Sequence, residues 1–397
     1  MKHFQVLIVG GGSAGLTVAS QLANKINPEG IAIVDPAAKH YYQPLWTLIG
    51  AGVFPKEESE REQADFIPAG STWIKEKVES FEPTTNQIKL ENGDQLSYDV
   101  LVVAAGIQID WDKIPGLKES VGKPGTGVCS NYAYETVEQT YFNIQNLRSG
   151  TAIFTHPATP IKCGGAPLKI NYLACDYWNK HGVRDKIKVK FIKGGPGIFA
   201  VKKYAQSLTK VADRYNIERV WQEDLVAIDP KKKEATFRNL DSGAETVQSY
   251  DMIHVTPPMS APDFIKNSPL AAESGWVEVD KHTTQHVRFP NVFALGDCSN
   301  LPTSKTGAAI RKQGPVAVAN ILSFLNNQVL GKNYDGYTSC PLVTGYGSLI
   351  LAEFGYDKLP MESFPFDQGE ERYSMYALKA YGLPRMYWHG MLKGREF

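Results

Sequence analysis

Several features that mark common classes of protein are missing from this sequence. It has no net charge, because 42 basic residues balance 42 acidic ones, so nucleic acid is not expected as its main partner. Its apolar runs fall well short of the roughly 18 residues needed to cross a bilayer. The chain enters a strand soon after Met1, so we expect either no signal or transit peptide or a sequence that is already the processed form.

The cysteines are scattered and odd in number. The absence of Cys-x-x-Cys spacing argues against a zinc ribbon, and the odd count argues against a secreted disulfide scaffold. The eight histidines show no metal-ligand spacing, so no metal is expected. The sequence still allows two of these cysteines to form a redox pair when folding brings them together. The five cysteines are Cys129, Cys163, Cys175, Cys298 and Cys340.

The N-terminus carries a dinucleotide-binding unit. An apolar strand runs into a G-x-G-x-x-G turn, a helix follows, and a second strand ends in Asp35. The glycines let a pyrophosphate approach the helix N-terminus, and the carboxylate binds a ribose hydroxyl. The pattern therefore predicts a bound dinucleotide. The glycines are Gly10, Gly12 and Gly15, the strands span 5–9 and 31–34, and the helix spans 16–22.

Three later segments predict how the chain returns to this unit. They are a buried strand that ends at Gly106, a second buried strand at 249–256, and a strand that ends in a glycine and the lone acid Asp297. In two-module flavoproteins such segments rejoin the FAD module, and the acid binds the ribityl chain. We therefore predict an α/β fold with two Rossmann-like modules. The expected limits are 1–110 and 250–330 for a discontinuous FAD-binding domain, 111–249 for the second domain, and 331–397 for a C-terminal segment.

The second module lacks the glycine fingerprint that NAD(P)H binding needs. Its first strand, at 151–154, is followed by His156-Pro-Ala-Thr-Pro-Ile-Lys-Cys-Gly-Gly-Ala-Pro167 and then by a helix at 166–178. The prolines add bulk and remove N–H donors, which disfavours a nucleotide. Cys163 stands there instead, just before the helix N-terminus and after Lys162. The partial positive charge of the helix N-terminus and the ammonium of Lys162 both favour the thiolate form of Cys163.

The other cysteines are less informative. Cys340 lies in a turn-rich segment, and no local sequence pattern pairs it with Cys163. The alternative that Cys340 is an inert loop cysteine therefore remains. Cys175 lies on the apolar face of its helix and is expected in the core. Cys298 follows the lone acid and is expected beneath the flavin turn. Cys129 stays ambiguous.

Over nearly its whole length the chain resembles the sulfide:quinone oxidoreductases, above all the branch that includes the mitochondrial enzyme. Several of the matching segments are long, ungapped and peculiar to that family. They are residues 10–15, 40–48, 159–167, 201–205, 254–260, 296–306 and 334–345.

The resemblance implies a fold like that of glutathione reductase, bound FAD, and a redox-active pair formed by Cys163 and Cys340. Sulfide would attack the oxidised pair, with Cys340 expected to hold the persulfide and Cys163 to reduce the flavin. Ubiquinone or menaquinone would take two electrons, and sulfite, glutathione, cyanide or a polysulfide would take the sulfur. The expected FAD contacts are Gly10, Gly12, Gly15, Asp35, Gln43, Gly106, Asp297, Lys305 and Thr306.

Two features depart from the family pattern. Cys129 lies where many bacterial members carry a third cysteine. It could shuttle sulfur, lie beside the flavin 8-methyl group, or have no role. Whether FAD is covalently attached is also left open. The short tail at 372–397 is basic and aromatic, which suits a membrane headgroup region, but a capping helix fits as well. Its grip on a membrane is expected to be weak or to need a homo-oligomer. Peripheral binding to the bacterial cytoplasmic membrane is favoured, or to the mitochondrial inner membrane for a processed form.

Three other functions share parts of this pattern. A type 2 NADH:quinone oxidoreductase has the same fold and acceptor, but the lost fingerprint disfavours it. The flavoprotein subunit of a sulfide dehydrogenase would normally need export. A flavin-binding sensor without turnover is disfavoured by the two retained cysteines.

Overall fold

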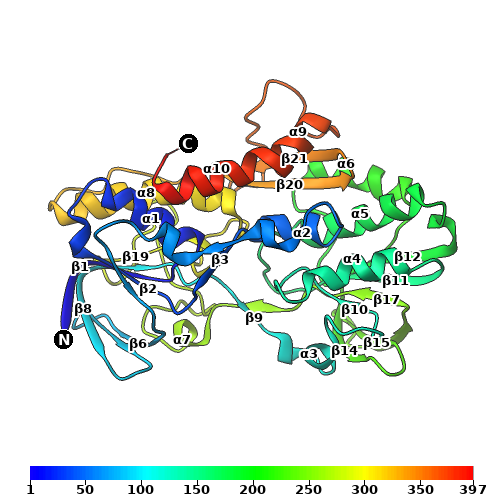
Figure 1. The fold of residues 1–397 in the computed structure, drawn as a ribbon, viewed down its shortest axis with the longest axis horizontal. Coiled ribbons are helices and arrows are strands. Elements are labelled where there is room, and N and C mark those ends of the chain that lie inside the picture. The colour runs from blue at the N-terminus through cyan, green and yellow to red at the C-terminus, as the bar shows by residue number, and fades with distance from the viewer. Residues whose placement is uncertain (397) are drawn as a thin grey trace.

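The computed structural model describes residues 1–396 and shows two sheets side by side along the long axis of the molecule (Figure 1). The first sheet has the order β5-β2-β1-β8-β7-β6, with β19 paired to β8. Its central strands are buried on both faces, which explains their unbroken apolar sequences. The strands are β1 (Lys2–Val9), β2 (Ile31–Val34), β5 (Thr72–Ile74), β6 (Val78–Glu82), β7 (Gln87–Leu90), β8 (Gln95–Val103) and β19 (Val292–Ala294).

The second sheet is parallel throughout and has the order β10-β17-β11-β12-β13. One prediction is wrong here: the strand predicted at 249–256 does not return to the first sheet. β17 pairs instead with β10 and β11, so the chain leaves the second module only after His254. The strands are β10 (Val128–Cys129), β11 (Gly150–His156), β12 (Ile187–Lys193), β13 (Glu218–Trp221) and β17 (Met252–His254).

Smaller antiparallel pairings surround these sheets. An extension of the second module is formed by β14 (Glu223–Asp229), β15 (Glu234–Asn239) and β16 (Glu245–Ser249). Further pairs join β3 (Lys39–Tyr41) to β4 (Glu60–Glu62), and β9 (Gln108–Ile109) to β18 (Met259–Ser260). The C-terminal hairpin of β20 (Thr338–Gly345) and β21 (Ser348–Phe354) packs on α5.

Helices cover the sheets as crossover connections. α1 follows the glycine turn and packs against α8, while α5 and α6 follow β11 and β12. Among residues 1–396, no helix combines the length and apolar character needed to cross a bilayer. The helices are α1 (Ser13–Ala23), α2 (Trp46–Ile49), α3 (Leu117–Ser120), α4 (Val137–Asn146), α5 (Ala166–Lys180), α6 (Lys202–Arg214), α7 (Asp263–Lys266), α8 (Gly307–Leu325), α9 (Tyr373–Ala377) and α10 (Leu383–His389).

The C-terminal segment, residues 373–396, folds back over the first module. After α9 comes a π-helical turn, η8 (Leu378–Gly382), then α10 and the short turn η9 (Met391–Lys393), which lies against α1 (Figure 1). Tyr387 and Trp388 are buried in the core, whereas Tyr373 and Tyr381 are 70% and 54% exposed. Most of this segment therefore caps the domain, and its exposed aromatic side chains lie toward α9 and η8.

Candidate active site

The structure brings Cys163 and Cys340 together, although they lie 177 positions apart in the sequence (340 − 163). Both are free thiols, and their sulfur atoms lie within hydrogen-bonding reach of each other. Cys163 stands in the loop between β11 and α5 and is half-buried, while Cys340 lies on β20 and is fully buried. A pair in this position can be closed to a disulfide and opened again by a small nucleophile.

Glycine allows the two cysteine-bearing segments to approach. A Cβ atom added at Gly165 would stand 2.3 Å from Cδ2 of Leu342, two residues beyond Cys340 on β20. Cys163 itself adopts a left-handed backbone with a φ of 54°, and its carbonyl accepts from the N–H of Ala166 at 2.8 Å. Gly165 thus serves close packing between α5 and β20.

The electrostatic surroundings shift the pKa values of the two thiols in opposite directions. The hydrogen bond from Cys340 and the ammonium of Lys169, whose Nζ lies 3.1 Å from Sγ of Cys163, hold the pKa of Cys163 well below its ordinary value. The same hydrogen bond and complete burial raise the pKa of Cys340 well above the ordinary value. Cys163 is therefore the thiolate and Cys340 the thiol that donates to it.

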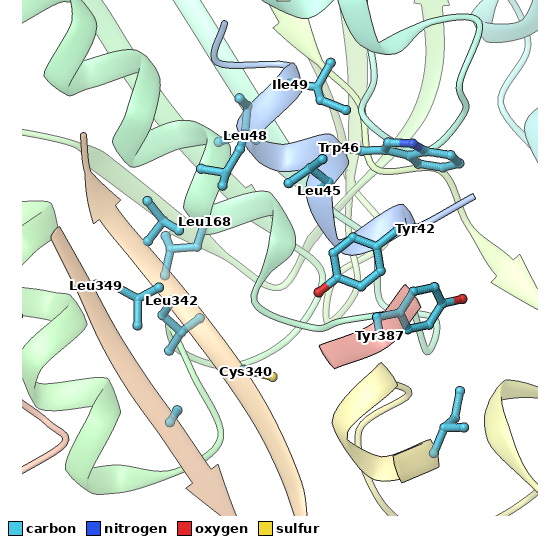
Figure 2. Close-up of a cluster of buried hydrophobic side chains, with 14 of the residues drawn as sticks. Tyr42, Leu45, Trp46, Leu48, Ile49, Leu168, Cys340, Leu342, Leu349 and Tyr387 are labelled. Carbon is cyan, nitrogen blue, oxygen red and sulfur yellow. The ribbon is translucent and has the colours of Figure 1, made fainter. Parts of the chain in front are cut away.

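A second lysine reaches this pair from the C-terminal segment. Lys379, in η8, is only 2% exposed, and its Nζ donates to the carbonyl of Pro44 at 2.6 Å. Burial and repulsion from Lys169 lower the pKa of Lys379 to about 7, while the Cys163 thiolate opposes that shift. The sequence left open whether this basic tail contacts membrane headgroups or caps the domain, and the structure buries Lys379 within electrostatic range of Cys163. Figure 2 shows Tyr42, whose ring lies 5.7 Å from Nζ of Lys379, and Cys340 in the same region.

Replacing Lys379 by methionine is expected to raise the melting temperature at pH 6 by several degrees. The folded state holds the proton of Lys379 with a pKa of about 7, against an ordinary value of 10.5. The cost of burying the ammonium is therefore fully present below pH 7 and disappears as the pH rises toward 10.5. Thermal unfolding of the reduced protein at pH 6 and pH 9 measures this effect, with replacement of the exposed Lys210 of α6 by methionine as control. An equal gain at both pH values would contradict the prediction.

The cysteine loop is fastened to the turn where the flavin ring is expected. The N–H of Cys163 donates to the carbonyl of Lys305 at 2.8 Å, directly before the N-terminus of α8. Nζ of Lys162 donates to Oε1 of Gln43 at 2.6 Å, and burial lowers the pKa of Lys162 to about 8. The loop thus contacts two of the segments that carry predicted FAD contacts, Gln43 and Lys305.

The surroundings of the glycine turn fit a dinucleotide. A Cβ atom added at Gly12, Gly106 or Gly307 would meet nothing within 4 Å, so these backbones border open space. At Gly10 and Gly15, in contrast, the same atom would strike backbone at 2.4 and 1.8 Å. Gly10 and Gly15 therefore allow the strand and helix to pack, and Gly12 leaves room for a ligand at the N-terminus of α1.

Acidic side chains lie at two places where a dinucleotide is expected to bind. The carboxylate of Asp35 accepts from the N–H groups of Gly11 at 2.5 Å and Ala37 at 2.7 Å, which fixes it beside the glycine turn. Asp297 is half-buried at the start of the turn before α8, and burial raises its pKa. A small cavity lined by Asp297 and Thr306 lies at this end. These positions suit a ribose and a ribityl chain, respectively.

Lys305 and Thr306 do more to support this turn than to face a ligand. Nζ of Lys305 donates to the carbonyls of Asp297 and Ser299, at 2.6 and 3.0 Å, and lies 3.7 Å from the centre of the Trp276 ring. Oγ1 of Thr306 caps α8 by accepting from an N–H group at 3.1 Å. The N-terminus of α8 itself is then the positive end that can face the pyrimidine part of a flavin.

The remaining cysteines are buried, and burial raises the pKa of each thiol. The values rise to about 12 for Cys129 and Cys175 and to about 11 for Cys298. Cys298 donates to carbonyls of Val103 and Leu295 beneath the flavin turn, as predicted. Cys129 lies on β10, where its thiol donates to the carbonyl of Ile253 at 3.6 Å. A buried thiol of this kind is a poor nucleophile, which weighs against the third redox role considered for Cys129.

The second module offers little room for a nucleotide at the end of β11. The proline-containing loop folds over the turn that follows β12, so a Cβ atom at Gly194 would stand 2.6 Å from the backbone N of Ala158. Protein atoms therefore fill part of the space that a pyrophosphate would need.

Two lysines of this site were missed by sequence reasoning. Lys169 follows Cys163 by six positions on a predicted helix, so its place one turn into α5 was a usable signal. Lys379 gave no such signal, because it lies far from both cysteines in the sequence, among residues of a basic and aromatic tail. Only the packing of η8 against Pro44 and Tyr42 brings it into electrostatic range of Cys163.

Comparison with known proteins places the chain among flavin-linked oxidoreductases. The sequence model of the family described as pyridine nucleotide-disulphide oxidoreductase matches residues 4–319. A mitochondrial sulfide:quinone oxidoreductase of Dictyostelium discoideum is 50% identical over 396 residues, which cover 99% of this chain and 87% of the relative. The mouse protein of the same name is 47% identical over 394 residues, with the same coverage.

A solved structure resembles the whole chain. The sulfide:quinone oxidoreductase of the bacterium Aquifex aeolicus superposes with a TM-score of 0.80 at 18% identity, covering 100% of this chain and 92% of that one. At this identity the match supports the predicted fold of two Rossmann-like modules, and it leaves the chemistry to the sequence relatives and to the site itself.

Proposed function

The chain belongs to the sulfide:quinone oxidoreductase family of the pyridine nucleotide-disulphide oxidoreductases, and on that premise we propose that it oxidises hydrogen sulfide at the Cys163–Cys340 pair. Two electrons pass through a flavin, proposed to be FAD, to a quinone. The observation that carries the proposal is the close approach of the Cys163 loop to the strand of Cys340, with the Lys169 ammonium 3.1 Å from the sulfur of Cys163.

The two sulfur atoms have separate tasks in the proposed reaction. Hydrosulfide attacks Sγ of Cys340 in the oxidised pair, the S–S bond breaks, and Cys163 leaves as a thiolate. Cys340 then holds the persulfide. The direction of attack follows from the low pKa of Cys163, because the thiol of lower pKa is the better leaving group.

Release of the sulfur completes the cycle. A nucleophilic acceptor, such as sulfite, glutathione, cyanide or a polysulfide, takes the outer sulfur and leaves Cys340 as a thiolate. When bound, FAD would accept two electrons from the reduced pair and deliver them to the quinone. The pair returns to the disulfide form, so one sulfide yields one sulfane sulfur and two electrons.

Lysine side chains favour the anions that this cycle needs. Lys169 donates to Cys163, and Lys379 adds a buried positive charge below pH 7, where its ammonium is the major form. Both charges attract hydrosulfide and stabilise the thiolate after the S–S bond breaks. Charge placed before the reaction in this way needs no reorganisation during it.

For the location of the protein we propose peripheral association with the mitochondrial inner membrane. The relatives named above are mitochondrial enzymes, so they give no support to the bacterial membrane that the sequence favoured. The exposed rings of Tyr373 and Tyr381 provide an interfacial contact through which a quinone could be drawn from the bilayer.

An anaerobic titration tests this function. Sulfide is expected to bleach the flavin absorbance of the purified protein, and added quinone is expected to restore it. NADH is expected to leave the absorbance unchanged on the same timescale, because the loop over Gly194 obstructs the nucleotide position of the second module. Rapid bleaching by NADH would favour a type 2 NADH:quinone oxidoreductase instead, and a flavin unaffected by sulfide would overturn the proposal.

A further inference from the structure

A chain of buried hydrogen bonds joins the C-terminal segment to both sides of the glycine turn. Nε2 of Gln63 donates to the carbonyl of Gly11 at 2.7 Å, and Oε1 of Gln63 lies 2.9 Å from Nδ1 of His40. Nε2 of His40 lies 2.5 Å from the hydroxyl of Tyr387, which lies 2.7 Å from Oγ of Ser13. Gln63, His40 and Tyr387 are 1%, 4% and 6% exposed, so these bonds are shielded from water.

The protons in this chain can be assigned from its ends. Because the amide of Gln63 donates to Gly11, its oxygen is the acceptor, and His40 must carry its proton on Nδ1. Burial lowers the pKa of His40, so the ring is neutral and Nε2 accepts from the hydroxyl of Tyr387. Because the hydroxyl of Tyr387 donates its only proton to His40, the hydroxyl of Ser13 must donate to the oxygen of Tyr387. Each of the four polar side chains therefore has at least one partner.

Both ends of the chain lie in the turn that is expected to hold the dinucleotide. Gly11 and Ser13 flank Gly12, the glycine whose surroundings are open. The N–H of Gly11 also fixes the carboxylate of Asp35, and a Cβ atom at Gly11 would stand only 2.1 Å from Nε2 of Gln63. The shape of the turn therefore depends on a hydroxyl that lies 374 positions from Ser13.

We propose that Tyr387 is a positioning residue for the dinucleotide, so that FAD binding and docking of residues 373–396 stabilise each other. The inference rests on the proposed FAD. Two further bonds hold the same segment: Oγ of Ser20 donates to the carbonyl of Leu392 at 2.8 Å, and Nζ of Lys393 donates to that of Asp65 at 2.5 Å. Coupling between two binding events is reciprocal, so cofactor loss loosens the segment that also carries Lys379.

The test compares Tyr387→Phe with Tyr376→Phe. The first change keeps the ring, which packs 4.6 Å from the centre of the Tyr42 ring, and removes the hydroxyl alone (Figure 2). Tyr376 is also a buried tyrosine of this segment, but it lies on α9, which packs on β21. The FAD dissociation constant, measured by fluorescence quenching on the deflavinated protein, is expected to rise about 5–10-fold for Tyr387→Phe and to stay within about twofold for Tyr376→Phe.

A second variant keeps the test decisive if Tyr387→Phe does not fold. Ser13→Ala removes the other end of the same bond and is expected to weaken FAD similarly, and the double variant is expected to lose less than the sum. Proteolysis of the C-terminal segment is expected to be faster without FAD than with it. Wild-type FAD affinity in Tyr387→Phe, or in Ser13→Ala where the first variant fails to fold, would overturn the inference. None of these measurements uses sulfide, so a flavin that sulfide cannot reduce would overturn the proposed function alone.

Discussion

Cys163→Ser and Cys340→Ser are each expected to slow the reduction of the flavin by sulfide by roughly a thousandfold or more. Either change removes one half of the disulfide, and a serine hydroxyl can neither form an S–S bond nor leave as a stabilised thiolate. Cys163 and Cys340 each shift the pKa of the other, and the other three cysteines are fully buried elsewhere, so none of them is expected to take over from the lost partner. Stopped-flow measurement of flavin bleaching under anaerobic conditions gives the rate.

Cys129→Ala is the matched control for these variants. Cys129 is fully buried, and its pKa is raised to about 12, so its removal is expected to change the rate by no more than about twofold. A loss as large as that of Cys163→Ser would revive the third redox thiol. If Cys163→Ser or Cys340→Ser reduced the flavin at the wild-type rate, the thiol mechanism would be wrong.

Lys169→Met is expected to lower the rate of flavin reduction at pH 7 by about 10–100-fold, the worth of one hydrogen bond to a charged group. The ammonium of Lys169 lies 3.1 Å from Sγ of Cys163 and helps to hold the pKa of that thiol down. Without it the pKa of Cys163 rises. Activity is therefore expected to recover as the pH increases, with the acid limb of the pH–rate profile moved to higher pH.

Two further variants separate this electrostatic role from a structural one. Lys180→Met lies on the same helix, where its exposed ammonium pairs with Asp176, and is expected to leave the profile in place. Lys169→Arg keeps the charge and is expected to restore part of the rate. A uniform loss in Lys169→Met at every pH, without displacement of the profile, would show that the lysine acts through packing alone.

The N-terminal module could be predicted from the sequence because its parts are neighbours in the chain. The strand, glycine turn, helix and second strand around Gly10–Gly15 follow one another within a single βαβ unit, and each is fixed by local pattern. The helix predicted after Cys163 begins at Ala166, where α5 begins. The pairing of Cys163 with Cys340, in contrast, came from the family resemblance, because no local rule links positions so far apart.

The sequence by itself determined the α/β class, the glycine turn, the missing second fingerprint and the cysteine that replaces it. Tertiary structure alone decided that β17 joins the second sheet, that Lys379 reaches the cysteines, and that Tyr387 braces the glycine turn. The reason is physical. Hydrophobic periodicity records which face of an element is buried, but not which element covers it. The element that covers a face determines which strands pair, what pKa a buried lysine has, and which hydrogen bonds form across 374 positions.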